Sequence, residues 1–315
     1  MKRRQSAGSK DAGRVPSTNP GGIPSLGFES KGREARVTLR TIRRMVRDGE
    51  VFACLTCYDA TTARWLERAG VHVLLVGDTA AEMILGFDRT VDMPLDVLLA
   101  LTAGVKRGAP SRLVMGDMPF MSYQADDAEA IRNAGRFVTE GRADIVKVEV
   151  DASFGPLVQK MARAGIPVCA HIGSRPQLAG LTGGYSSAGK TKEQADAIVK
   201  AAKVMEEAGA VMLLIEAVPD ELAARVVERS GIPVIGIGAG PSPHGQVLVL
   251  HDLLGLNDQS PTFAMRMASV GEEIQRAAQE WVRASAERRV GGVASIAPRA
   301  SKTPAARGGG RRRKP

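Results

Sequence analysis

Short apolar segments recur along the chain, and each ends in a polar or glycine-rich turn. Eight of them occupy residues 51–56, 73–77, 113–116, 145–149, 167–171, 211–216, 233–238 and 247–252. Stretches with helical character separate them, at about residues 59–69, 94–107, 126–141, 153–164, 191–208 and 219–230. Continuous apolar runs between helices are typical of parallel strands that are buried on both faces. The alternation therefore predicts an α/β fold with right-handed crossovers.

Eight strand–helix units predict closure into a (β/α)8 TIM barrel, in which active sites lie at the carboxyl ends of the strands. A basic amphipathic helix at residues 37–48 precedes the first strand, and we expect it to plug the N-terminal end of the barrel. A last long helix is predicted at residues 262–288, with Ile274, Ala278, Trp281 and Val282 along one face. A doubly wound open sheet is the alternative, but no Gly-x-Gly-x-x-Gly motif follows the first run.

Charge divides the 315 residues into a catalytic domain at 36–287 and two basic tails at 1–35 and 288–315. The first tail has seven basic and three acidic residues, and the second has nine basic residues and no acidic residue. Since the whole chain carries +9, the domain between the tails carries −4. Both tails lack apolar periodicity and are rich in small and polar residues, so we expect them to be disordered.

The basic charge of the tails suggests possible binding partners. Such a tail can contact nucleic acid or acidic lipid through non-specific electrostatics, although we favour a solvated extension.

The sequence has no run of about 18 apolar residues, so we expect no membrane span. No apolar stretch follows Lys2, so we expect no signal peptide. The three cysteines do not form a disulfide framework, and we interpret Cys54 and Cys57 as core residues. We therefore expect a cytoplasmic protein.

Three acidic residues stand at the ends of three different runs: Asp78, Asp117 and Glu149. A barrel would bring them together above its core, where carboxylates repel one another unless a cation is present. Oxygen ligands of this kind suit Mg²⁺. The alternative is that each acid merely caps the helix that follows it.

Three further ionisable residues occupy the predicted strand ends. Lys147 shares a strand face with Glu149, where it would form either a structural ion pair or a contact to an anionic substrate. His171 closes the fifth run. Glu216 ends an unusually apolar run, which makes it a candidate general acid or base, with a helix cap as the alternative.

These residues lie in motifs that resemble the ketopantoate hydroxymethyltransferase family, within the phosphoenolpyruvate mutase/isocitrate lyase superfamily. The resemblance covers residues 37–256, and several motifs in order make it more specific than any one of them. The matching motifs lie at residues 75–78, 116–123, 146–149, 171–173, 216–219, 235–240 and 245–252.

The resemblance implies a (β/α)8 barrel, a homo-oligomer such as a decamer, and Mg²⁺ held at Asp78 and Asp117 with Glu149 in or near the coordination shell. It implies that Thr79 and Lys147 contact a 2-oxo acid and that Glu216 is the proton acceptor. We place His171 with Asp78, Thr79, Asp117 and Lys147 in the substrate-binding set. The implied reaction transfers a hydroxymethyl group from 5,10-methylenetetrahydrofolate to 3-methyl-2-oxobutanoate through a Mg²⁺-stabilised enolate.

The loops beyond these positions depart from the family pattern at residues 79–81, 87–90, 150–151, 174–175 and 186–188. Arg89 and Arg175 would add positive charge near the mouth of the barrel and favour a more anionic substrate. Two alternatives therefore stay open. One is a paralogue that uses the same chemistry on another 2-oxo acid, and the other is a weakly active barrel tethered to an acidic partner by its tails.

Overall fold

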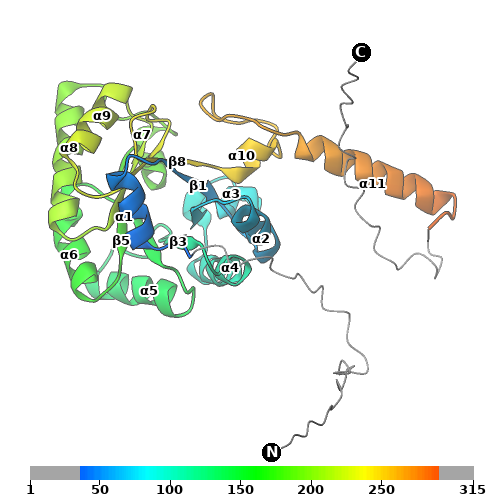
Figure 1. The fold of residues 1–315 in the computed structure, drawn as a ribbon, viewed down its shortest axis with the longest axis horizontal. Coiled ribbons are helices and arrows are strands. Elements are labelled where there is room, and N and C mark those ends of the chain that lie inside the picture. Colours follow the sequence, from blue (N-terminus) through cyan, green and yellow to red (C-terminus); the bar gives the residue numbers. More distant parts are fainter. Residues whose placement is uncertain (1–35, 291–315) are drawn as a thin grey trace, which may run out of the picture. The chain divides into compact units, whose positions relative to one another are not determined.

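Eight parallel strands form a closed barrel in the computed structural model, which describes residues 36–290 (Figure 1). Each strand pairs with its neighbours in chain order, and β8 closes the barrel on β1. The strands are β1 (Phe52–Thr56), β2 (Val73–Val76), β3 (Leu113–Asp117), β4 (Ile145–Glu149), β5 (Val168–Gly173), β6 (Met212–Glu216), β7 (Val234–Ile237) and β8 (Gly245–Leu248). The predicted TIM barrel is therefore confirmed. The predicted tails lie outside the described residues except for 288–290.

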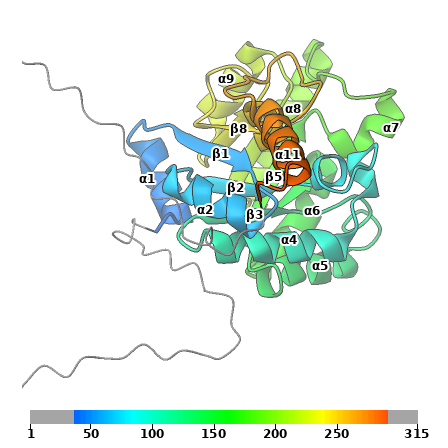
Figure 2. The same cartoon turned by 90° about the vertical axis from the view of Figure 1, so that its right-hand side faces the viewer.

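Helices cover the outside of the strands, as the two views in Figures 1 and 2 show. The predicted helices are present with ends shifted by a few residues: α1 (Leu39–Arg47), α2 (Ala60–Arg68), α4 (Leu95–Gly108), α5 (Asp127–Thr139), α6 (Gly155–Arg163), α8 (Lys192–Glu207), α9 (Asp220–Arg229) and α11 (Val270–Ala286). Short helices that the pattern did not predict are α3 (Ala80–Met83), α7 (Ala179–Thr182) and α10 (Leu250–Leu254). Three 3₁₀ turns are η1 (Thr90–Asp92), η2 (Ala152–Phe154) and η3 (Pro176–Leu178).

Two hydrophobic clusters follow from the alternation of side chains along each strand. The outward-facing residues, such as Leu74 and Val146, pack against the helices. The inward-facing residues, such as Met115 and Met212, fill the barrel together with Ile42 of α1. Because Ile42 is fully buried among these strand residues, α1 lies against the barrel interior, as expected of a plug.

The C-terminal helix α11 begins later than the pattern predicted. Its apolar face stays open: Ile274, Trp281 and Val282 are each more than half exposed. None of the helices between residues 36 and 290 combines the length and apolar character needed to span a bilayer.

Candidate active site

Strand alternation places the ionisable residues inside the barrel. Leu113 and Met115 of β3 face inward, so Asp117 does as well. The same rule sets Lys147 and Glu149 above Ile145 on β4. All seven predicted site residues line one cavity of about 60 Å³ at the carboxyl ends of the strands: Asp78, Thr79, Asp117, Lys147, Glu149, His171 and Glu216.

The three strand-end acids do not cap the helices that follow them. Asp117 Oδ2 accepts a hydrogen bond from the Asp78 backbone N–H at 3.0 Å. Glu149 Oε2 accepts one from the backbone N–H of Gln177, which lies in η3 after β5. By contrast, Asp59 accepts from the N–H groups of Thr61 and Thr62 and is an ordinary N-cap of α2. The carboxylates of Asp78, Asp117 and Glu149 are therefore available for chemistry rather than used for helix capping.

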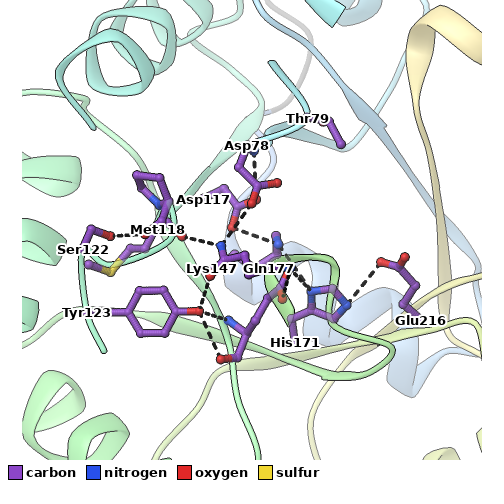
Figure 3. A network of polar contacts seen from close by, with 12 residues as sticks. Asp78, Thr79, Asp117, Met118, Ser122, Tyr123, Lys147, His171, Gln177 and Glu216 are labelled. Carbon is purple, nitrogen blue, oxygen red and sulfur yellow. Dashed lines mark hydrogen bonds and ion pairs between the residues drawn. The ribbon is translucent and has the colours of Figure 1, made fainter. Parts of the chain in front are cut away.

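Asp78, Asp117 and Lys147 form the buried centre of the site (Figure 3). Lys147 Nζ lies 2.8 Å from Asp117 Oδ1. Burial raises the pKa of Asp78 to about 8, the charge of Asp117 adds to this, and the Lys147 ammonium opposes it. Burial would lower the pKa of Lys147, but the surrounding carboxylates together raise it above its ordinary value. Lys147 therefore stays an ammonium ion at neutral pH.

His171 connects this centre to Glu216. Burial and the Lys147 charge lower the pKa of His171, so its ring is neutral at neutral pH. Nδ1 of the ring lies 3.4 Å from Lys147 Nζ and 3.6 Å from Glu149 Oε1. Nε2 lies 3.3 Å from Glu216 Oε2, a close contact that does not have hydrogen-bond geometry (Figure 3).

The main chain around Glu216 is held by a close approach between β5 and β6. The Glu216 carbonyl accepts a hydrogen bond from Ser174 N at 2.9 Å. Gly173 has a φ of +93°, and a Cβ there would meet the Glu216 carbonyl oxygen at 2.6 Å, so only glycine fits this position. The Glu216 side chain remains 21% exposed toward the cavity, which leaves it accessible to a substrate.

The hydroxyl of Thr79 is also held in place. It lies 2.6 Å from the hydroxyl of Tyr58, a buried residue at the end of β1. Thr79 lines the strand-end cavity, and either hydroxyl can donate to the other. Thr79 thus keeps a hydroxyl at the position that the resemblance assigns to substrate contact.

Two buried residues of the site were missed in the sequence. Tyr123 OH accepts from the Glu149 backbone N–H at 3.0 Å, and Gln177 bonds both Asp78 and Glu149. Gln177 lies in the loop after β5, and a single glutamine after a proline carries no distinctive pattern. Tyr123 lies in one of the motifs noted above, and this was the one signal that pointed to it.

The donor set fits a divalent cation. Asp78, Asp117 and Glu149 are buried with only one ammonium, Lys147, so two negative charges are unbalanced when all four ionise. Glu149 Oε1 accepts no hydrogen bond among the described residues, and the Lys147 ammonium is the contact of Asp117 Oδ1. Within residues 36–290, no three acidic, His or Cys side chains form a ready-made metal cage. Mg²⁺ needs only one or two carboxylates, because waters and substrate oxygens complete its shell.

A larger cavity of about 320 Å³ lies beside the site, between the ends of β4 and β5 and helix α8. None of the seven predicted site residues lines it. At its edge Arg175 Nη1 is paired with Asp151 Oδ2 at 3.0 Å, and on another loop Arg89 is paired with Asp92. The two arginines therefore have local partners and add little free positive charge to the mouth.

Comparison with known proteins gives a consistent result. The family model described as ketopantoate hydroxymethyltransferase matches residues 36–290. A 3-methyl-2-oxobutanoate hydroxymethyltransferase of Geotalea daltonii is 41% identical over 78% of this chain and 92% of that protein. The enzyme of that name from Hyperthermus butylicus is 43% identical over 79% of this chain and 86% of that protein.

Solved structures with the same fold are more distant in sequence. A phosphonopyruvate hydrolase in complex with oxalate and Mg²⁺ is 14% identical, with a TM-score of 0.54 over 82% of this chain and 93% of that one. A 2,3-dimethylmalate lyase, a member of the PEP mutase/isocitrate lyase superfamily, is 18% identical with a TM-score of 0.53 over 84% and 93% of the two chains. At these identities the likeness concerns the fold.

Proposed function

This chain belongs to the ketopantoate hydroxymethyltransferase family, and on that basis we propose that it transfers a hydroxymethyl group from 5,10-methylenetetrahydrofolate to 3-methyl-2-oxobutanoate, forming 2-dehydropantoate. One observation carries the proposal: the seven residues singled out in the sequence line a single cavity at the strand ends. The overall reaction breaks the C3–H bond of the acid, forms a C3–C bond, and releases tetrahydrofolate with the uptake of one water.

We propose that Asp78 and Asp117 hold Mg²⁺, with Glu149 beside them. The unbalanced negative charge and the raised pKa of Asp78 support this assignment. A protein of the same fold is described in complex with oxalate, a two-carbon diacid, and Mg²⁺. Bound Mg²⁺ would supply a Lewis acid that polarises the keto group of the substrate.

The chain's own residues bind the acid and move its proton. Lys147 places a permanent ammonium charge at the floor of the cavity, where it attracts the anionic 2-oxo acid. Glu216 is the proton acceptor for C3, and its carboxylate lies 3.3 Å from His171 Nε2. Because Lys147 holds Nδ1 of the same ring, binding and proton transfer use one connected row of side chains.

The test is deuterium exchange at C3 of 3-methyl-2-oxobutanoate in D₂O without the folate donor, followed by proton NMR. We expect exchange that needs Mg²⁺ and that is faster than for pyruvate or oxaloacetate. Adding 5,10-methylenetetrahydrofolate should then convert the acid to 2-dehydropantoate. Exchange no faster than in an EDTA control would count against the proposal.

A second expected outcome concerns proton release on Mg²⁺ binding. A carboxyl whose folded pKa lies above its unfolded value is ionised at a cost to stability, and for Asp78 this cost grows as pH rises from its ordinary pKa to about 8. At pH 7 Mg²⁺ should therefore displace a proton from Asp78, and its affinity should rise until the pH passes about 8. Calorimetry in two buffers of different ionisation enthalpy measures this release, and buffer-independent heats at pH 7 would contradict it.

The paralogue alternative receives no support from the two arginines that suggested it. Arg89 and Arg175 are both ion-paired to neighbouring aspartates, so a more anionic substrate gains little from them. The pyruvate and oxaloacetate arms of the exchange experiment compare the two functions directly.

We also propose a homo-oligomer, a decamer by resemblance to the family. The open apolar face of α11 supports an interface of some kind, because Trp281 and Val282 are largely exposed. The cytoplasmic location and the role of the basic tails stay predictions.

A further inference from the structure

Gln177 joins parts of the site that are distant in sequence. It lies in η3, after β5, and is buried. Its backbone N–H donates to Glu149 Oε2 at 3.0 Å. Its side-chain Nε2 donates to Asp78 Oδ2 at 3.0 Å and to the Met118 carbonyl at 2.9 Å (Figure 3). One residue therefore bonds two of the three carboxylates, which come from β2 and β4.

The orientation of the Gln177 amide is determined by its partners. Of the two groups that face Nε2, the Met118 carbonyl can only accept a hydrogen bond, and Asp78 Oδ2 accepts the other N–H. On the other side, Oε1 lies 2.8 Å from Tyr123 OH and 3.0 Å from Gln124 Nε2. A flipped amide would set its oxygen against two acceptors. Both N–H groups and both lone pairs of the amide are thus used, which fixes the side chain in one position.

A neutral amide is the group that this position requires. The cluster already holds three carboxylates and one ammonium, so a further carboxylate would add repulsion, and a further ammonium would compete with a cation. An amide N–H can hold a carboxylate oxygen without changing the charge and without acting as a ligand itself. The remaining oxygens of Asp78 and Glu149 are then presented to the cavity.

From these contacts we infer that Gln177 is a positioning residue: it holds Asp78 and Glu149 in the orientation that receives the divalent cation and the 2-oxo acid. The inference rests on the proposed function. It extends the proposed cation site to include the loop after β5. Gln177 does not line the strand-end cavity, so its effect on a bound cation or acid would act through the two carboxylates.

Mn²⁺ binding tests the inference without turnover. Binding is measured by the electron paramagnetic resonance signal of free Mn²⁺, with and without 3-methyl-2-oxobutanoate and without the folate donor. In Gln177→Met and Gln177→Ala we expect the Kd for Mn²⁺ to rise about 10- to 100-fold, as when partners of metal ligands are removed. The KM for the 2-oxo acid should rise in parallel.

Arg175→Gln is the matched control, because it alters the same loop two residues away. It removes the ion pair to Asp151 but touches none of the three carboxylates. Its Kd for Mn²⁺ should stay within about twofold of that of the unaltered protein. Thermal unfolding in EDTA checks that each variant is folded. Gln124→Met, which retains Gln177 but removes one donor to Oε1, gives a milder second variant with a several-fold weaker affinity expected.

The outcomes separate the two proposals. If the folded variants at position 177 bind Mn²⁺ as tightly as the unaltered protein, or lose only thermal stability, Gln177 is a structural residue and the inference is overturned while the proposed function stands. If the unaltered protein binds no Mn²⁺ and catalyses no C3 exchange, the proposed function is overturned and the inference with it.

Discussion

Asp117→Asn is expected to lower kcat/KM by about 10³-fold or more, because several kcal/mol of transition-state stabilisation depend on the cation. The amide retains the size of the side chain and an oxygen that can accept from Asp78 N, so the local fold should persist. It removes the charge that pairs with Lys147 and that we propose for binding Mg²⁺. Asp78→Asn should have a similar effect. Steady-state kinetics at saturating donor, with Mn²⁺ binding measured in parallel, provide the check.

Asp59→Asn is the matched control for these two substitutions. Asp59 also follows a strand, but it caps α2, and asparagine is about as good an N-cap as aspartate. Its activity should therefore change little. If Asp78→Asn and Asp117→Asn both remain fully active and bind Mn²⁺ normally, the metal assignment is wrong.

The strands and their inward residues were predictable because a closed barrel uses one simple alternation. Once Met115 and Ile145 are assigned to the interior, Asp117 must face inward because it lies two residues after Met115. Glu149 must face inward because it lies four residues after Ile145. The sequence therefore placed the charged rim as well as the core. The choice between helix caps and chemistry was open, and it needed the hydrogen-bond partners of each carboxylate.

The last strand shows where local pattern fails. The apolar run was predicted to extend through residues 247–252, but β8 ends at Leu248 and α10 begins at Leu250. The N–H of Leu250 donates to Oγ1 of Thr56, the last residue of β1, which lies 194 positions earlier in the sequence. A bond between segments so far apart leaves no local signal, and the helix therefore began where the apolar run alone predicted strand.

Gln177 was missed for the same reason. Its partner Asp78 is 99 positions away in the sequence, and the two meet only because β2 and the β5 loop face each other across the barrel mouth. Single acids at strand ends are visible in a sequence, because their position is periodic. The neutral residues that orient them are not periodic and become visible only in three dimensions.

Glu216→Gln is expected to slow C3 deuterium exchange by about 10²- to 10⁴-fold, the usual contribution of a positioned general base. The amide has nearly the shape of the carboxylate, so the cavity should keep its form. The affinity for the 2-oxo acid should change little, because the proposed function assigns the binding of the acid to the cation and Lys147 rather than to Glu216. Exchange at saturating Mg²⁺ and acid, together with calorimetric binding, separates the two effects.

Glu221→Gln is the control from the same connection, since Glu221 lies exposed in the first turn of α9, shortly after β6. It should exchange and bind like the unaltered protein. A Glu216→Gln protein that loses the acid but exchanges normally per bound molecule would make Glu216 a binding residue. In that case the base would have to be another group at the mouth of the barrel.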